Sequence, residues 1–368
     1  MNWRTTFAPV LLVGLATLPV TARQNDEEMR ALEAIRKLDG SYELDAKTRS
    51  PVRVVLRGPK ITDTALEHLK ALTTLQELWL ANTAISDAGL EALKGLTNLR
   101  MLDLYQTAIT DAGLESVGAL STLRQLNLGD TKITDNGLAH LKSLTRLNTL
   151  DLNRTAVTGA GLKDLKGLAR LQSLSLVGAK ASDAGLASLK ELTGLQQLNL
   201  SASAVSDAGM KHIRALARLH ELGLSNTAVG DGGLAALGAL SHLQKLSLMY
   251  TRITDAGLVH LARLKELQSL GLQYTAVTGA GLQHLKGLTK LQTLELAWCK
   301  VADAGLENLK GMTDLQTLSL QHTQMSDAGL KMLESLSNLK VVDVDDTKVT
   351  AGGVAAFRKA RPKVLVIY

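Results

Sequence analysis

Residues 99–122 have the sequence LRMLDLYQTAITDAGLESVGALST, and this 24-residue unit recurs along most of the chain without insertion or deletion. Its leading leucine returns at Leu75, Leu99, Leu123, Leu147, Leu171, Leu195, Leu219, Leu243, Leu267, Leu291, Leu315 and Leu339. A fixed period of this length predicts a solenoid, in which each unit buries its apolar face only by stacking on its neighbours.

Each unit predicts one short strand and one short helix. Leu102, Asp103 and Leu104 alternate apolar and polar side chains, as in a strand with one buried face. Thr110 and Asp111 are both residue types that begin helices, and either can cap the helical segment that follows. About twelve such units predict an α/β horseshoe with short parallel strands on its concave face and short helices on its convex face.

One inward position carries a threonine in most units, and its hydroxyl is predicted to bond the backbone of the adjacent loop. The threonines are Thr83, Thr107, Thr131, Thr155, Thr227, Thr251, Thr275, Thr323 and Thr347. Ala179, Ser203 and Cys299 take this position in the other units. Cys299 is the only cysteine, so no disulfide forms within the chain, and we expect a small buried side chain rather than a nucleophile.

The first residues have the features of a secretory signal peptide. Arg4 supplies a positive charge, residues 8–20 are apolar, and small residues precede a cleavage site after Ala22. We therefore assign residues 1–22 to a signal peptide and expect an exported protein that is periplasmic, in the cell envelope or extracellular. The apolar run is too short to span a bilayer, so no integral membrane segment is expected after cleavage.

The rest of the chain divides into a solenoid and two caps, because an open solenoid end exposes its core. Residues 23–60 predict an N-terminal cap made of a helix and a β-hairpin. Residues 61–350 form the solenoid, and residues 351–368 form a C-terminal cap. The last strand, at residues 364–368, is an apolar edge. We expect a monomer, with pairing of this edge into a dimer as the alternative.

The motif L-x-x-L-x-L-x-x-T-x-[IV]-T-D-x-G-L-x-x-L covers roughly residues 61–350. It resembles the cysteine-containing class of leucine-rich repeats known from F-box substrate receptors, with threonine in the cysteine position. It is more similar still to bacterial exported proteins built almost wholly of such units. The resemblance implies a recognition scaffold. No F-box segment is present, so the resemblance does not extend to ligase recruitment.

The sequence contains no pattern typical of catalysis. No serine, histidine and acid occur at a plausible spacing, and neither a glycine-rich phosphate loop nor an HExxH motif is present. We therefore predict a protein that is not an enzyme and that uses no cofactor and no metal.

Basic residues recur near the end of each helical segment, at Lys70, Lys94, Lys142, Lys166, Lys190, Arg214, Lys286 and Lys310. Cations there complement helix C-termini and keep the surface soluble. The alternative is a basic stripe for a polyanion such as nucleic acid, acidic polysaccharide or membrane headgroups. Export and the lack of interleaved aromatic residues argue against nucleic acid.

The concave positions have the opposite charge. Their acids are Glu77, Asp103, Asp130, Asp151, Glu221, Glu295, Asp343, Asp345 and Asp346, against the two bases Arg154 and Lys245. A chain with a formal net charge of +6 is thus predicted to present an acidic inner surface.

Aromatic residues are rare, at 3% of the chain, and gather at the same concave positions. Tyr250, Tyr274 and Trp298 hold one position in three successive units, and His322 continues the row. Trp79 and Tyr105 belong to the first two units. Leucine fills the core everywhere, so these rings are not needed there, and such residues are frequent binding hot spots. The alternative is that they only cover the rim.

We predict a protein or peptide partner, with basic residues that suit the concave acids. The predicted contacts are Trp79, Tyr105, Tyr250, Tyr274, Trp298, His322, Glu295 and Asp103. A carbohydrate-binding protein and a purely structural envelope protein are the alternatives.

Overall fold

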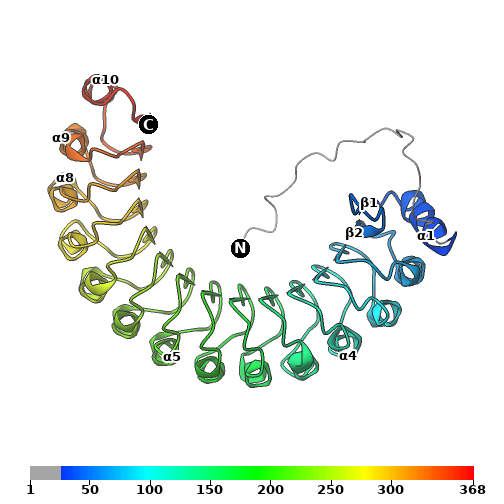
Figure 1. The fold of residues 1–368 in the computed structure, drawn as a ribbon. Coiled ribbons are helices and arrows are strands. Elements are labelled where there is room, and N and C mark those ends of the chain that lie inside the picture. Colours follow the sequence, from blue (N-terminus) through cyan, green and yellow to red (C-terminus); the bar gives the residue numbers. More distant parts are fainter. Residues whose placement is uncertain (1–25) are drawn as a thin grey trace.

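The computed structural model describes residues 26–368, so the predicted signal peptide at residues 1–22 lies outside the described residues. These residues form one curved arc, with strands along its inner side and helices along its outer side (Figure 1). The strands make one 15-stranded sheet whose spatial order is the chain order, β1 to β15. The predicted solenoid of parallel strands and short helices is confirmed.

The first elements close the N-terminal end of the sheet. Helix α1 (Asp26–Lys37) is followed by strands β1 (Ser41–Leu44) and β2 (Pro51–Val55), which pair antiparallel. Strand β2 then pairs parallel with β3 (Glu77–Trp79). Three residues of α1, Ala31, Leu32 and Ile35, are buried against the core.

The remaining strands are three residues long and pair in register with a shift of one unit, so that Leu246 lies opposite Leu270. They are β4 (Met101–Asp103), β5 (Gln125–Asn127), β6 (Thr149–Asp151), β7 (Ser173–Ser175), β8 (Gln197–Asn199), β9 (Glu221–Gly223), β10 (Lys245–Ser247), β11 (Ser269–Gly271), β12 (Thr293–Glu295), β13 (Thr317–Ser319), β14 (Val341–Asp343) and β15 (Leu365–Ile367). The constant 24-residue period explains this register, because equivalent residues of successive units are 24 positions apart and a slip by one residue would turn the leucines away from the buried face.

The outer side consists of short α-helices and 3₁₀ helices, the latter labelled η. The α-helices are α2 (Asp63–Glu67), α3 (Asp87–Leu90), α4 (Gly113–Gly118), α5 (Asp207–Ile213), α6 (Asp231–Leu234), α7 (Asp255–Leu258), α8 (Asp303–Leu306), α9 (Asp327–Met332) and α10 (Ala351–Ala360). The 3₁₀ helices are η1 (His68–Ala71), η2 (Glu91–Leu93), η3 (Gly137–Ser143), η4 (Ala160–Leu165), η5 (Gly185–Glu191), η6 (Ala235–Ala239), η7 (Val259–Arg263), η8 (Gly281–Leu285), η9 (Glu307–Leu309) and η10 (Leu333–Ser335).

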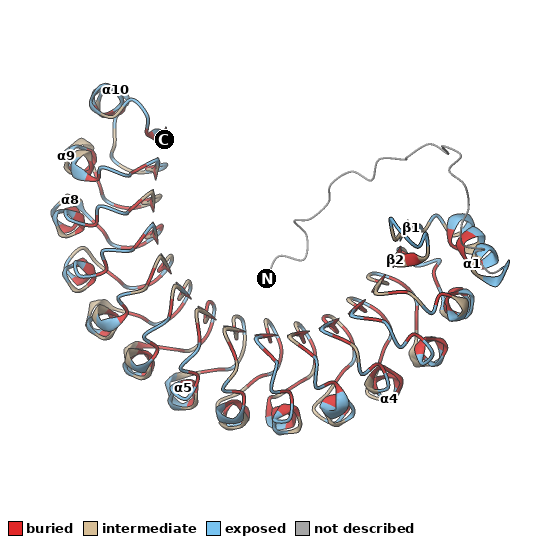
Figure 2. Cartoon of the chain, in the orientation of Figure 1, coloured by how far each residue is buried: buried red, intermediate tan, exposed pale blue. Residues whose placement is uncertain are grey.

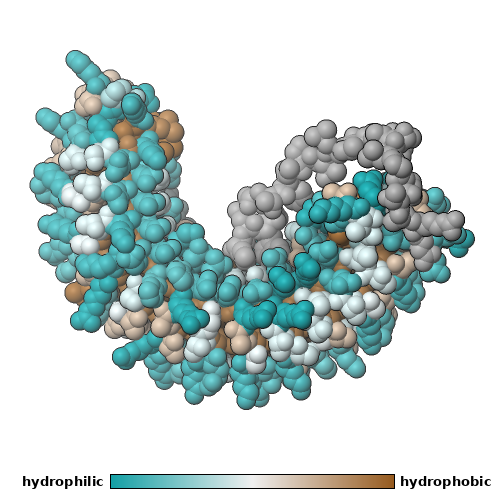
Figure 3. All heavy atoms as spheres, viewed as in Figure 1, coloured by the Kyte–Doolittle hydropathy of each residue, from teal (hydrophilic) through white to brown (hydrophobic). Residues whose placement is uncertain are grey.

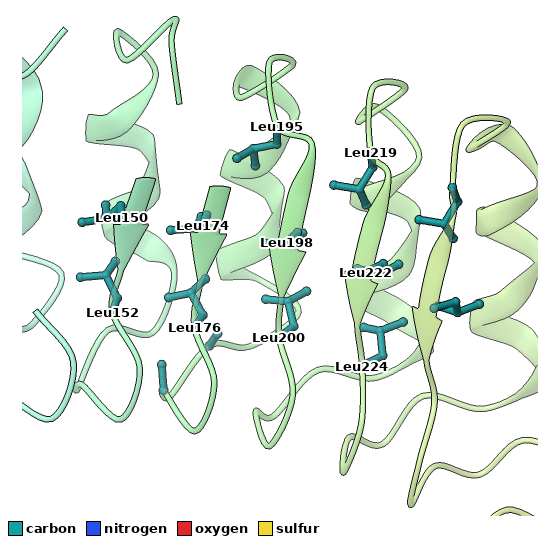
Figure 4. Close-up of a cluster of buried hydrophobic side chains, with 14 of the residues drawn as sticks. Leu150, Leu152, Leu174, Leu176, Leu195, Leu198, Leu200, Leu219, Leu222 and Leu224 are labelled. Atoms are coloured by element: carbon teal, nitrogen blue, oxygen red, sulfur yellow. The ribbon is translucent and has the colours of Figure 1, made fainter. Parts of the chain in front are cut away.

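The core lies between the strand layer and the helix layer, where buried residues run the length of the arc (Figure 2). Leucines of equivalent positions form continuous rows across neighbouring units (Figure 4). Examples are Leu150, Leu174, Leu198 and Leu222, each exposed by 2% or less. Every unit thus buries its apolar side chains against the next one.

The inward threonines stabilise their own loops. The Thr107 hydroxyl donates to the carbonyl of Leu104, three residues earlier, at 2.8 Å, and the other threonines of the row repeat this bond. Cys299 is 2% exposed, as expected for a small buried side chain, and its thiol donates instead to the Leu272 carbonyl at 3.1 Å. Burial raises the pKa of that thiol.

Aspartates link consecutive units in a way that the sequence did not reveal. Asp87 accepts hydrogen bonds from the backbone N–H and the hydroxyl of Thr110 in the following unit, at 2.8 and 2.6 Å. The same pair of hydrogen bonds joins Asp63 to Ser86, Asp111 to Thr134, Asp135 to Thr158, Asp183 to Ser206, Asp231 to Thr254, Asp255 to Thr278, Asp303 to Ser326 and Asp327 to Thr350. We call this row the aspartate ladder.

The ladder resolves the choice of helix cap. The hydroxyls of Ser206, Thr254 and Ser326 each accept from the N–H two residues later, at 3.2 to 3.3 Å, so in α5, α7 and α9 the residue before the aspartate caps the helix. The aspartate side chain reaches the next unit instead. The glycine of the recurring Asp-Ala-Gly sequence makes room for it, because a Cβ on Gly113 would overlap the carboxylate of Asp87.

At the last strand, Leu365 and Ile367 are 57% and 43% exposed. The Arg358 guanidinium, from α10, donates to the Val366 carbonyl at 3.0 Å and lies over the Tyr368 ring. This contact occupies one of the acceptors that an added strand would use.

Candidate binding surface

The aromatic row follows the ends of strands β10 to β13. Tyr250, Tyr274, Trp298 and His322 each lie in the turn after a strand, so the row runs along the rim of the concave sheet. All four have a left-handed backbone, with φ between 51° and 62°. Each N–H donates to a carbonyl of the following unit, as from Tyr250 to Gln273 at 3.0 Å, which fixes the turn.

This turn position does not require an aromatic residue. Left-handed conformations favour glycine, asparagine and aspartate, whereas bulky residues adopt them rarely. Other units hold the favoured types here, among them Asn82, Asp130, Gly178 and Asn226. Ala202 also adopts this conformation, with φ 55°. Three consecutive large rings therefore reflect something other than the needs of the backbone.

The four rings stack on one another. The ring centroids lie 4.0 Å apart between Tyr250 and Tyr274, 5.1 Å between Tyr274 and Trp298, and 3.7 Å between Trp298 and His322. The planes are within 14° to 24° of parallel. We call this set the aromatic stack. Its three large rings keep 49%, 38% and 46% of their surface exposed.

Polar contacts hold both ends of the stack. A hydrogen bond with the side chain of Tyr274 raises the pKa of the Tyr250 phenol, and burial adds to the shift. At the other end, Nδ1 of His322 contacts the carboxylate of Asp346, which holds the same turn position in the next unit.

The stacking decides which parts of the rings meet a ligand. Tyr274 and Trp298 have a neighbouring ring on each face, so the exposed parts of these two rings are their edges. Tyr250 alone among the three has a face without an aromatic neighbour, on the side of the exposed Asn226. Stacking of a sugar ring needs an open aromatic face, and the inner rings of the stack offer none.

Trp79 and Tyr105 occupy other positions of the unit and are half-buried. A ring carbon of Tyr105 would lie 3.0 Å from a Cβ on Gly129, so this ring extends over the next unit. The two residues therefore do not prolong the aromatic stack.

The two predicted acids differ in exposure. Asp103 is only 4% exposed and accepts a hydrogen bond from the N–H of Tyr105 at 3.0 Å. Burial raises its pKa to about 6. Asp103 therefore offers a partner much less surface than its outward strand position predicts. Glu295 is half-buried and accepts a hydrogen bond from the side-chain amide of Gln273.

Ion pairs reduce the predicted acidity of the inner surface. Glu77 pairs with Arg53 at 2.6 Å, and Glu221 pairs with Lys245 at 2.6 Å. The contribution of Arg53 was missed because this residue lies in strand β2, before the first full unit. Exposed acids remain at Asp345 and Asp346, beside the His322 end of the aromatic stack.

A shallow hollow of about 260 Å³ lies on the inner face of strands β7 to β12. Small side chains make its floor, at Ser173, Ser175, Gly223, Ser247, Ser269 and Gly271. Glu221, Lys245 and Glu295 border it, so its charges are mixed. Within residues 26–368, no three histidine, cysteine or acidic side chains are grouped to hold a metal ion. No helix in the same range is long and apolar enough to cross a bilayer.

Comparisons with known proteins agree with this geometry. A family model described as a leucine-rich repeat region matches residues 53–283, and a second leucine-rich repeat model matches residues 287–310 and 311–333. No curated protein sequence matches the chain.

Among solved structures, an internalin (inlF) from Listeria monocytogenes is similar, with a TM-score of 0.70 and 22% identity over 92% of this chain and 94% of that one. A leucine-rich repeat protein of Leptospira interrogans has a TM-score of 0.63 and 22% identity, over 82% of this chain and 74% of that one. The ectodomain of the Arabidopsis thaliana receptor kinase GASSHO1/SCHENGEN3, solved in complex with Casparian strip integrity factor 2, has a TM-score of 0.50 and 14% identity, over 86% of this chain and 43% of that one.

Proposed function

Because the chain belongs to the leucine-rich repeat family, we propose that it is a non-enzymatic scaffold that binds a protein or peptide on its concave side. The aromatic stack at the rim is the proposed centre of the contact. Glu295 and the acids beside His322 flank it, and Trp79 and Tyr105 form a second, smaller contact near the N-terminal end. The proposal includes export, in keeping with the leader-like residues 1–22.

The proposal rests on one observation. Large, exposed rings occupy a turn position whose left-handed backbone favours asparagine or glycine. Tyr250 and Trp298 expose nearly half of their surface, so a partner that covers them removes apolar area from water. A single buried tyrosine or tryptophan at the centre of an interface contributes about 2 kcal/mol or more. The rings stack on one another before binding, so little side-chain freedom is lost when a partner covers them.

The exposed ring edges suit a peptide better than a sugar. Aromatic edges carry partial positive charge and favour carbonyl oxygens and the faces of other rings, both of which a polypeptide supplies. The carboxylates of Asp345 and Asp346 at the end of the stack add an attraction for lysine or arginine in the partner.

The similar structures support a binding role at the level of the fold. The Arabidopsis ectodomain is itself solved in complex with another molecule, Casparian strip integrity factor 2. Its likeness to this chain concerns the fold alone, so the residues of the present proposal come from this chain's own surface.

The proposal is tested by affinity capture from an extracellular or envelope extract, followed by titration of any retained protein. The test variant is Tyr274→Ala/Trp298→Ala. The matched control is Gln106→Ala/Arg154→Ala, which changes the same turn position outside the stack. Ala202 shows that alanine is compatible with this turn, so both variants are expected to unfold at the temperature of the unchanged protein.

We expect the test variant to lose at least tenfold in affinity, the equivalent of about 1.4 kcal/mol, and the control to lose less than about twofold. Equal binding by all three proteins would remove the aromatic stack from the contact. Retention of a soluble glycan that competes with the captured protein would favour the carbohydrate alternative. Retention of nothing would leave a structural role.

A further inference from the structure

The outer side of four consecutive units is strongly basic. Residues 137–146, 160–170, 185–194 and 209–218 contain nine lysines and arginines and two acids, Asp164 and Glu191. The cations are Lys142, Arg146, Lys163, Lys166, Arg170, Lys190, Lys211, Arg214 and Arg218, all of them exposed. We call these nine residues the basic convex patch. Its excess of seven positive charges is larger than the formal charge of +6 for the whole chain.

The patch lies on the outer side of the arc, from just after α4 to α5 (Figure 1), where Figure 3 shows mostly hydrophilic side chains. It is therefore on the opposite side of the molecule from the aromatic stack. A ligand on one surface leaves the other accessible, and the inference below does not depend on the proposed function.

Three of the four equivalent lysines outside the patch are neutralised within their own unit, and the fourth, Lys286, follows Gln283 instead of an acid. Lys70 pairs with Glu67 at 2.5 Å, Lys94 with Glu91 at 2.6 Å, and Lys310 with Glu307 at 2.6 Å. In each case the acid stands three residues before the lysine. Inside the patch that position holds Ala139, Lys163, Ala187 and Lys211 in successive units, so two of these units have a further cation where the paired lysines have a glutamate.

The nearby aspartates do not compensate. The carboxylate of Asp183 accepts hydrogen bonds from the N–H and the hydroxyl of Ser206, at 2.8 and 2.5 Å, as part of the aspartate ladder. Across the described residues 137–218, the patch forms one ion pair, Lys190 with Glu191 at 4.0 Å. Burial, and then the charges of Lys211 and Lys190, lower the pKa of His212. The positive charge of the patch thus affects the protonation of a neighbouring side chain.

Four of the lysines converge on a surface hollow of about 610 Å³ between η3, η4 and η5. Lys142, Lys163, Lys166 and Lys190 line it together with Asp164 and Glu191, so four cations face two acids there. Long lysine side chains around an open hollow present several ammonium groups to one anionic segment, and the remaining arginines extend the charge to the next unit.

The residue types and the shape of the patch favour one class of polyanion over the others. Residues 137–218 contain no phenylalanine, tyrosine or tryptophan, so they offer neither platforms for nucleic acid bases nor interfacial anchors for a bilayer. The patch is also convex, and a flat membrane touches an arc over only part of its length. A flexible linear polymer can follow the arc from one unit to the next.

We propose that the basic convex patch binds a linear acidic polysaccharide, whose carboxylates or sulfates contact the lysines and arginines of successive units. Binding of this kind is dominated by the release of counterions and therefore weakens steeply as salt concentration rises.

The test compares binding of polygalacturonate and dextran sulfate, with neutral dextran as the blank, over a series of salt concentrations. The test variant is Lys163→Glu/Lys211→Glu. It places a glutamate three residues before Lys166 and Arg214, which is the arrangement that Glu67 and Lys70 already show, so the fold accommodates it. The control is Lys331→Glu/Lys348→Glu. It changes the net charge of the protein by the same amount at two exposed positions outside the patch.

We expect the test variant to weaken polysaccharide binding about tenfold at low salt and to lower the slope of log affinity against log salt by about two. The control is expected to lose less than about threefold. An equal loss in both variants would show that only net charge matters and would overturn the proposal. Tighter binding to phosphatidylglycerol vesicles or to single-stranded oligonucleotides than to either polysaccharide would overturn it in favour of that other polyanion.

Discussion

Replacement of Gly159 by aspartate tests the account of how the units are joined. Most units have an aspartate at this position, so a comparison of the units with one another favours Gly159→Asp as a stabilising change. The structure predicts the opposite. Gly159 has φ +97°, and a Cβ there would lie 2.9 Å from Cα and 3.1 Å from the carbonyl carbon of Gly185.

The magnitude follows from three contributions. The left-handed backbone costs aspartate about 1 kcal/mol, the low end for a non-glycine residue, and the contact with the Gly185 backbone requires a local shift that costs about 1–3 kcal/mol. Against this, the new carboxylate would accept hydrogen bonds from Ser182. The gain is limited to about 1 kcal/mol, because the Ser182 N–H already donates to the Thr158 carbonyl at 3.1 Å. We expect a net loss of about 2 kcal/mol.

Urea unfolding and hydrogen exchange measure this effect. The exchange of amides in residues 158–186 should accelerate, because each unit of a solenoid contacts mainly its neighbours. The control is Gly95→Asp, where no atom lies within 4 Å of the added Cβ and the change should be within about 0.5 kcal/mol of neutral. A midpoint for Gly159→Asp equal to or above that of the unchanged protein would refute the reasoning.

Three further predictions concern titration and reactivity. Hydrogen bonds from the backbone and hydroxyl of Thr350 lower the pKa of Asp327, so its stabilising effect is present above the ordinary aspartate pKa and is lost as pH falls through the lowered one; Asp327→Asn should flatten acid unfolding curves in that range. Burial and a raised thiol pKa should make Cys299 react with iodoacetamide only after unfolding, and rapid labelling of the native protein would contradict its placement. Tyr274→Phe should shift the phenol titration of Tyr250, followed by ultraviolet absorbance, back toward the usual range, because the raised pKa depends first on the hydrogen bond between the two side chains.

The period alone was enough to predict the fold, because a residue's place in the 24-residue unit determines which side chains are buried. Leu102 and Leu104 belong to the core for this reason, and both are fully buried. The aspartate ladder was not predicted, because Asp111 satisfies the same local pattern as a helix cap. Its role depends on Thr134, 23 residues later, and a motif describes one unit at a time.

The candidate site was predictable only in part, for a related physical reason. Equal positions in successive units place Tyr250, Tyr274 and Trp298 side by side, and the structure shows them stacked. Exposure does not follow from position, however. Asp103 shares an outward strand position with Glu295, yet Asp103 is buried and Glu295 is half-buried, since the size of the surrounding side chains differs between units.

Extension of the aromatic stack by one ring separates two modes of binding. Asn226 precedes Tyr250 at the same turn position, has φ 54° and is exposed, so Asn226→Tyr should add a ring against the open face of Tyr250. If a partner contacts the ring edges, the longer stack should bind it as well as before or more tightly. If the partner inserts a side chain or a sugar against that face, the new ring should block it and lower affinity at least tenfold. Asn226→Ala leaves the face open and serves as the control. A loss with tyrosine but not with alanine would refute edge-on recognition, which is the step that ties this surface to a polypeptide ligand.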